Sequence, residues 1–170
     1  MNIYSQPFLY FSRMQRKVYT IEQIKRKMER YCIYQDRCHQ EVEKKLREFF
    51  LIDIAKEEIL LHLMEHDFLN ETRFSQSYAR GKFRIKKYGK QRIVRELKSR
   101  NITAYNIKKA LNEIEEEVYK ATAFELVVKK NASLTEQNPF KKKKKLFDYM
   151  ARKGYEYDLI NEAIATVLNE

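Results

Sequence analysis

Backbone breakers are scarce in this chain: its 170 residues include three glycines, two prolines and no tryptophan. β-Hairpins depend on frequent turn residues, so this scarcity argues against a sheet of many strands. Lys, Glu, Leu and Ile, which all occur widely in α-helices, are abundant. The sequence therefore predicts helix throughout.

Cysteine is equally scarce. Cys32 and Cys38 are the two present, and they imply no disulfide framework, so we expect reduced thiols in a cytoplasmic protein. No run of about eighteen apolar residues occurs, and we expect no membrane span. Residues 1–19 lack the basic region and cleavage site of a secretory signal. We expect them to form an irregular N-terminal arm.

Acidic residues are too few to balance the basic ones. The chain has 24 Asp or Glu against 35 Lys or Arg, which gives a formal net charge of +11. A net charge of this size is evidence about the partners that the protein binds, and it says nothing about the fold. Nucleic acid is the commonest polyanion to match it, followed by an anionic membrane or an acidic protein surface.

The basic residues concentrate between residues 74 and 100. Ten Lys or Arg lie between Arg80 and Arg100, and Glu96 is the one acid among them. Apolar residues at helical spacing run through the same stretch and predict a buried face. We assign that face to Phe74, Tyr78, Ile85, Ile93 and Leu97.

Most runs of like charge are solvated helix faces, but here the bases repel one another with little local compensation. A polyanionic partner would offset that repulsion, so we favour a binding surface. Phe83 and Tyr88 lie among the bases and suit stacking on nucleobases. The candidate contacts in this stretch are Arg80, Lys82, Arg84, Lys87, Lys90, Arg92, Arg95 and Lys98.

A second basic run, Lys141–Lys145, follows Pro139 at the predicted start of a helix. Positive charge there opposes the helix dipole, so stability does not explain it. A phosphate or acidic-protein contact and a merely solubilising run are both compatible with it. We add Lys142 and Lys144 to the candidate interface.

Enzymatic and metal-binding motifs are missing. Cys32, Cys38 and the three histidines match no common zinc spacing. The chain contains no glycine-rich phosphate loop, nucleophile elbow or isolated carboxylate pair. We expect no enzymatic activity, no metal and no cofactor.

Apolar periodicity and capping residues predict the helices. Thr20, Asn70 and Thr103 are the expected N-caps, and breaks are expected at Tyr88-Gly89 and Gly154. The acidic cluster Glu113–Glu117 marks a boundary or a kink before a long helix that reaches about Asn131. The apolar face of that helix is predicted to be Val118, Ala121, Phe124 and Val128.

The same spacing of apolar residues across two consecutive predicted helices occurs twice in the chain. Leu97, Ile102 and Ile107 follow Ile93 at the same intervals at which Met150, Tyr155 and Ile160 follow Leu146. A looser copy begins at Val42. The sequence thus predicts an all-α fold of three tandem three-helix repeats stacked into an elongated, curved array. The predicted repeats span residues 20–67, 68–112 and 113–170, after the arm at 1–19.

Four segments of residues 20–170 resemble the RecX regulatory proteins in their order and spacing. These are RYCIYQDRCHQEVEKKL, NETRF at 70–74, YGKQRIVRELKSRNI and LFDYMARKGYEYDLI. Ser75, where the family usually has Ala, and the dense lysine run depart from the pattern. The resemblance implies a non-enzymatic protein that lies in the groove of the RecA recombinase filament on single-stranded DNA. It would inhibit or modulate the ATPase, strand-exchange and co-protease activities of the filament.

The resemblance therefore adds a role in recombinational DNA repair and the SOS response, for a protein that we expect to be a monomer. Two other functions stay open. One is a stand-alone nucleic-acid-binding protein of the helical-repeat type, and the other is a structural adaptor with a basic surface.

Overall fold

α-Helices joined by short loops form the whole of residues 18–168, the part of the chain described by this computed structural model. No strand occurs within that range, which confirms the all-α prediction. The elements are α1 (Ile21–Tyr34), α2 (His39–Leu46), η1 (Arg47–Phe49), α3 (Asp53–Glu65), α4 (Glu71–Lys86), α5 (Lys90–Lys98), α6 (Ala104–Leu111), α7 (Glu116–Ala132), α8 (Pro139–Lys153) and α9 (Tyr157–Leu168).

The helix starts follow from local capping chemistry. Thr20 and Gln23 form a reciprocal capping box at α1. The side chains of Asn70 and Thr103 accept backbone N–H groups at the starts of α4 and α6. All three predicted caps are confirmed, and Asn138 caps α8 in the same way.

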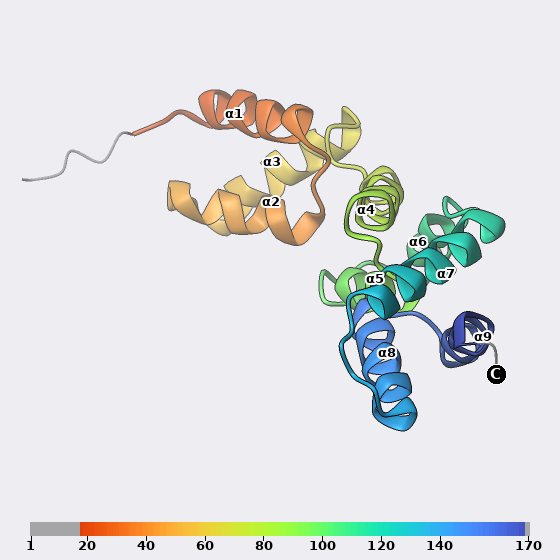
Figure 1. Cartoon of the computed structure of the whole chain (residues 1–170). Helices are drawn as coiled ribbons and strands as arrows, with labels where there is room; N and C mark the ends of the chain where they lie inside the picture. Colours follow the sequence, from red (N-terminus) through yellow and green to blue (C-terminus); the bar gives the residue numbers. More distant parts are fainter. Residues whose placement is uncertain (1–17, 169–170) are drawn as a thin grey trace, which may run out of the picture.

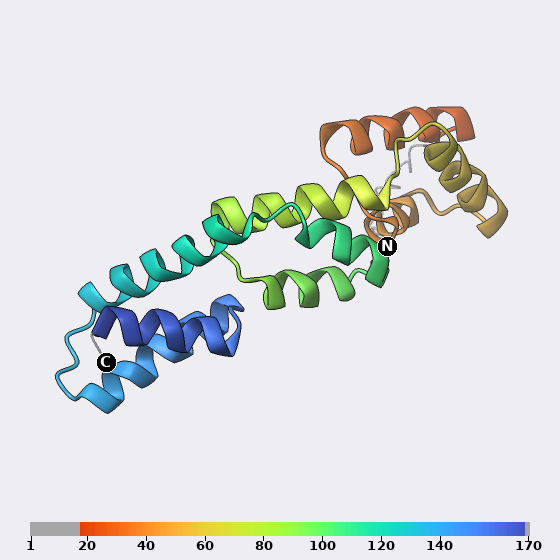
Figure 2. The same ribbon diagram turned by 90° about the vertical axis from the view of Figure 1, so that its right-hand side faces the viewer.

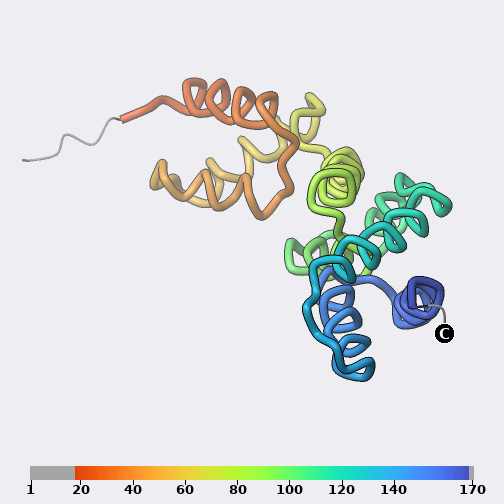
Figure 3. Tube along the Cα trace, in the orientation of Figure 1, coloured from red at the N-terminus to blue at the C-terminus, as the bar shows by residue number. Residues whose placement is uncertain are grey.

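The helices form three successive groups along an elongated, bent path (Figures 1 and 2). We call these groups repeat 1 (α1–α3), repeat 2 (α4–α6) and repeat 3 (α7–α9), and the trace in Figure 3 follows them in order. The predicted tandem array of three-helix repeats is thereby confirmed. We propose 67/68 and 112/113 as the domain boundaries, because both fall in loops between helices.

The hydrophobic core of residues 18–168 is divided into two clusters. Repeat 1 has its own cluster, with Ile24, Leu46 and Ile59 at its centre. A second cluster extends from Phe74 in α4 to Ile164 in α9, and Cys38 of repeat 1 is its one buried member from outside repeats 2 and 3. Repeats 2 and 3 therefore share one core, to which repeat 1 contributes Cys38.

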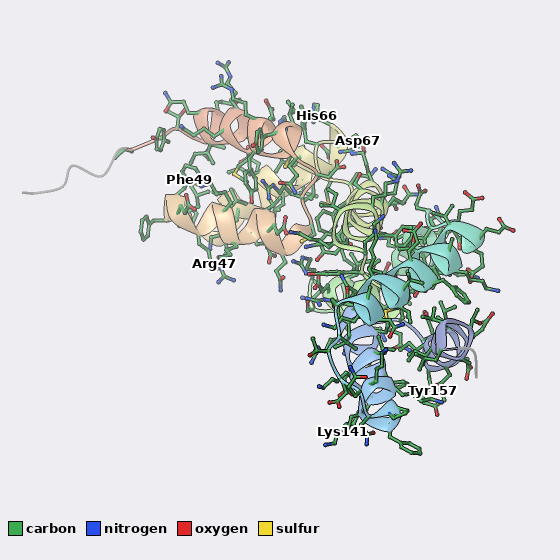
Figure 4. The ribbon with its side chains drawn as sticks, in the orientation of Figure 1. Arg47, Phe49, His66, Asp67, Lys141 and Tyr157 are labelled. Carbon is green, nitrogen blue, oxygen red and sulfur yellow. The ribbon has the colours of Figure 1, made fainter. Side chains whose placement is uncertain are left out.

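Polar contacts join repeat 1 to repeat 2. Arg73 at the start of α4 donates from Nε to Asp36 at 2.8 Å and from a terminal nitrogen to Asp67 at 2.6 Å. Ser77 also donates to Asp36, at 2.7 Å. Burial raises the pKa of Asp36, but the hydrogen bonds from Arg73 and Ser77 outweigh it and hold the pKa below its ordinary value. Figure 4 shows Asp67 beside the start of α4.

Backbone contacts join repeats 2 and 3. The N–H of Gly89 donates to the carbonyl of Lys153 at 2.8 Å, and that of Gln91 to Gly154 at 3.1 Å. The start of α5 is therefore capped by the end of α8. Gly154 ends α8 with a φ of +89°, a conformation that glycine adopts without strain. The predicted break at Gly154 is confirmed.

Two predicted apolar faces are wrong in part. Ile85 is 77% exposed, whereas Phe74, Ile93 and Leu97 are buried as predicted and Tyr78 is half-buried. α4 buries Phe74, Ala79 and Phe83 instead.

The acidic cluster Glu113–Glu117 marks a full break between helices and not a kink, because α6 ends at Leu111 and α7 begins at Glu116.

The apolar face of α7 is also displaced from the predicted one. Val118, Ala121 and Val128 are exposed and Phe124 is half-buried. Tyr119, Ala123 and Val127 enter the core instead. The reason is that apolar residues occur on several sides of α7, so spacing alone does not select the buried side.

Candidate nucleic-acid interface

The cations between residues 80 and 100 fall into two classes. Within residues 18–168, four of the predicted contacts form ion pairs with carboxylates and four form none. The expectation that Glu96 alone opposes them is wrong, because two residues of the acidic cluster Glu113–Glu117 also pair with these cations. A carboxylate oxygen of Glu113 is 2.6 Å from a terminal nitrogen of Arg80, and one of Glu116 is 2.5 Å from Nζ of Lys90.

Glu96 lies at the centre of the first class. Its carboxylate is 3.2 Å from Nε of Arg92 and 3.8 Å from Nζ of Lys82, and it accepts the hydroxyl of Tyr78. Burial raises the pKa of Glu96, but the hydrogen bonds from Tyr78 and Arg92 hold the pKa below its ordinary value. This acid therefore stays ionised and neutralises part of the positive stretch.

Arg92 has a structural role in addition to its ion pair. Its guanidinium lies 3.8 Å from the ring centroid of Tyr88 and donates to the carbonyl of Arg152 at 3.2 Å. These contacts fasten α5 to the end of α8. Arg92 is consequently a poor candidate for a free phosphate contact.

The two aromatic residues chosen for base stacking do not offer free rings. Phe83 is 6% exposed and packs against Tyr119 at 5.8 Å between centroids, so the stacking hypothesis is wrong for it. Tyr88 is half-buried, and the cations of Arg92 and Lys82 approach its ring. Both aromatic rings support packing and cation–π contacts within the fold.

The second class consists of cations that make no ion pair with any residue of the described range 18–168. Arg95 and Lys98 are both exposed and lie three residues apart on α5, so they project from the same side of the helix. Arg84 is exposed near the end of α4, and Lys87 follows in the left-handed conformation that terminates this helix. Lys86, exposed beside them, was omitted from the prediction although it belongs to the same run.

The lysine run at 141–145 occupies the free end of α8, where Figure 4 labels Lys141. Lys145 binds Glu136 at 2.8 Å, and Lys144 lies 3.6 Å from Asp148. Lys142 is half-buried and makes no ion pair with residues 18–168. Since α8 is about 20 Å long and its other end contacts α5, this run forms a patch separate from the cations of α4 and α5.

The cysteines and histidines are used in packing. Cys32 is 5% exposed, and burial raises the pKa of its thiol to about 11. His62 is 2.7 Å from Glu29 and packs against His66 with ring centroids 4.3 Å apart. Within residues 18–168 no three His, Cys, Asp or Glu side chains gather as metal ligands. The helices in that range are also too short or too polar to cross a bilayer.

Two family models match the chain. One is described as RecX, second three-helix domain, and covers residues 70–111, and the other as RecX, third three-helix domain, and covers residues 117–164. Among curated relatives, the regulatory protein RecX of Bacillus cytotoxicus is 28% identical over 140 residues. That alignment covers 82% of this chain and 52% of the relative, so the chain spans about half the length of such relatives.

Other relatives and solved structures agree. The regulatory protein RecX of Clostridioides difficile is 24% identical over 130 residues, which are 75% of this chain and 61% of that protein. The crystal structure of RecX from Lactobacillus salivarius superimposes with a TM-score of 0.77 at 23% identity, over 88% of this chain and 97% of the other. A second crystal structure, of a regulatory protein RecX, gives 0.74 at 21% identity, over 88% and 74%. With the models of two successive three-helix domains matched in order, the chain belongs to the RecX family of regulatory proteins.

Proposed function

We propose that this protein binds the RecA recombinase filament on single-stranded DNA and restrains its ATPase, strand-exchange and co-protease activities. The single observation that carries the proposal is membership of the RecX family, whose curated members are named regulatory proteins. The protein would act as a monomer in the cytoplasm during recombinational repair and the SOS response. It would perform no chemistry and would act by blocking extension and conformational cycling of the filament.

The cations that make no ion pair within residues 18–168 support a DNA-facing surface in the middle of the array. Arg84, Lys87, Arg95 and Lys98 come from the end of α4 and from α5, two helices of the same repeat. Because no carboxylate of residues 18–168 pairs with them, phosphates brought near them would relieve the repulsion between them. Each phosphate contact would contribute about −0.7 to the slope of log affinity against log salt on a single strand.

The other predicted contacts take secondary roles. Four of them already form ion pairs with carboxylates, so they could contact phosphate only by sharing or breaking those pairs. These are Arg80, Lys82, Lys90 and Arg92. Lys142 and Lys144 at the free end of α8 would form a second contact with the filament. An elongated array suits such separated contacts, because its repeats follow an extended partner.

The test compares two activities in the same buffer. The DNA-dependent ATPase of RecA is measured with and without this protein, beside binding to bare single-stranded DNA at two salt concentrations. Inhibition at concentrations too low to coat the DNA supports the proposal. Strong DNA binding with an unchanged ATPase refutes it and favours the stand-alone nucleic-acid-binding protein, whereas neither effect favours the adaptor.

A further inference from the structure

A groove of about 350 Å³ runs along the outer side of α4, from the loop after α1 to the last turn of α4. Its α4 residues recur at intervals of three and four, so they form one stripe, which is buried in the core at Phe74 and exposed at Ile85 and Lys86. The floor is mainly apolar, and the rim toward the end of α4 is basic. The α4 residues that line it are Phe74, Ser77, Tyr78, Gly81, Lys82, Ile85 and Lys86.

Gly81 lines this groove, and packing within residues 18–168 does not explain why glycine is there. It lies in the interior of α4, where glycine weakens a helix relative to alanine. A Cβ placed on Gly81 would meet no atom of residues 18–168 within 4 Å, so packing in that range does not require glycine there. What the missing side chain provides is an open notch in which another molecule can approach the helix backbone closely.

Ile85 is the second unexplained residue. It is 77% exposed and joins neither hydrophobic cluster of residues 18–168. A singly exposed apolar side chain is ordinary, but Ile85 lines a mainly apolar groove, and such a groove is a feature that a partner can cover. Ile85 is one turn beyond Gly81, so the notch and the apolar side chain form one continuous feature.

A nucleobase is a poor fit for this groove. Bases stack on free aromatic faces, but the ring of Tyr78 has the cations of Lys82 and Arg100 at 5.0 and 4.8 Å from its centroid. Its hydroxyl is bonded to Glu96. Phe74 is 3% exposed and belongs to the hydrophobic core, so its ring has no free face for a base.

The charges at the rim define the chemistry of the partner. Lys82 and Lys86 line the groove; Lys82 is 3.8 Å from Glu96 and would share its charge with a second carboxylate, whereas Lys86 makes no ion pair within residues 18–168. At the other end Asp36 is already bonded to Arg73 and Ser77. We infer that the α4 groove binds a protein segment that inserts an apolar side chain between Gly81 and Ile85 and brings carboxylates to Lys82 and Lys86. This inference rests on the proposed function, since it takes that segment to belong to RecA.

The test uses substitutions at Gly81 and Ile85 with a matched control. Gly81→Ala should raise the Tm of the free protein by about 2–4 °C because alanine favours the helix, yet lower affinity for the RecA filament severalfold. Ile85→Asp should lower that affinity by at least about tenfold without lowering Tm. Ile54→Asp, at a 75% exposed position in repeat 1, should change neither quantity.

Filament affinity is measured on RecA assembled on a labelled oligonucleotide with a slowly hydrolysed ATP analogue, and DNA affinity on the bare oligonucleotide. Normal binding of bare DNA by both groove variants, with weakened filament binding, supports the inference. Filament binding at the wild-type level overturns it and leaves the proposed function intact. An equal loss on bare DNA also overturns it, because the groove would then hold the strand. If the wild-type protein does not bind the filament, the proposed function is refuted, and RecA is refuted as the partner of the groove.

Discussion

The contribution of the junction between repeats 2 and 3 to stability can be tested by adding one methyl group, with the substitution Gly89→Ala. Gly89 precedes α5 with a φ of −72°, which alanine adopts without strain. A Cβ at this position would nevertheless lie 2.1 Å from the carbonyl oxygen of Gly154 and 2.4 Å from the nitrogen of Tyr155. Both are backbone atoms that no rotamer change can move. Gly89→Ala must therefore push α5 and the end of α8 apart.

The size of the effect follows from the hydrogen bonds and packing that this displacement disrupts. A displacement of about 1 Å takes the Gly89 to Lys153 hydrogen bond, 2.8 Å long, out of bonding range and weakens the one from Gln91. Two such bonds contribute about 1 kcal/mol each. Disturbed packing around Tyr155, which is 2% exposed, adds about 1–3 kcal/mol. Gly89→Ala should therefore lower the free energy of unfolding by about 3–5 kcal/mol.

Urea denaturation followed by far-ultraviolet circular dichroism measures this change, and thermal melting should show a Tm lower by about 10 °C. Gly81→Ala is the matched control, because the same methyl group meets no atom there and should stabilise the protein. A Gly89→Ala protein within about 1 kcal/mol of wild type would show that the two glycines do not hold the repeats together.

Three further predictions concern charge and thiol chemistry. Arg95→Glu with Lys98→Glu should reduce the salt slope of single-strand binding by about 1.4 while leaving Tm unchanged, as measured by fluorescence anisotropy across a salt series; an unchanged slope would show that neither residue contacts phosphate. Asp36→Asn should lower the free energy of unfolding by about 1–2 kcal/mol at neutral pH. Because the pKa of Asp36 is depressed in the fold, its stabilisation is complete above its ordinary pKa of 3.8 and is lost as the pH falls through the lower folded value. Urea titrations at neutral and acidic pH should thus converge for wild type and variant, and a constant difference would contradict the assignment. Cys32, buried and with a pKa of about 11, should resist thiol reagents at pH 8 until the protein unfolds; rapid modification of the native protein would contradict its burial.

Local features of this fold were predictable from the sequence because they depend on near neighbours. The caps at Thr20, Asn70 and Thr103 and the break at Gly154 each involve a few consecutive residues. The tandem repeat was predictable as well, since the same apolar register recurs from Ile93 and from Leu146.

Choices between adjacent helix faces were not predictable. In α4 the stripes at Phe74–Phe83 and at Tyr78–Ile85 are both apolar, and only packing against the rest of the fold decides which one is buried. The acid partners were missed for a related reason. Glu113 is 33 residues from Arg80, and Glu116 is 26 residues from Lys90, so a local count of charges overlooks both.

The central claim is that the partner is the RecA filament and not DNA alone. The most direct measurement titrates this protein into the RecA ATPase reaction and compares the half-inhibitory concentration with the Kd for the same bare oligonucleotide at the same salt. We predict half-inhibition at least about tenfold below that Kd, a difference of about 1.4 kcal/mol that DNA contacts alone cannot supply. Half-inhibition that coincides with the Kd at every salt concentration would mean that the protein competes only for DNA, and would contradict the account.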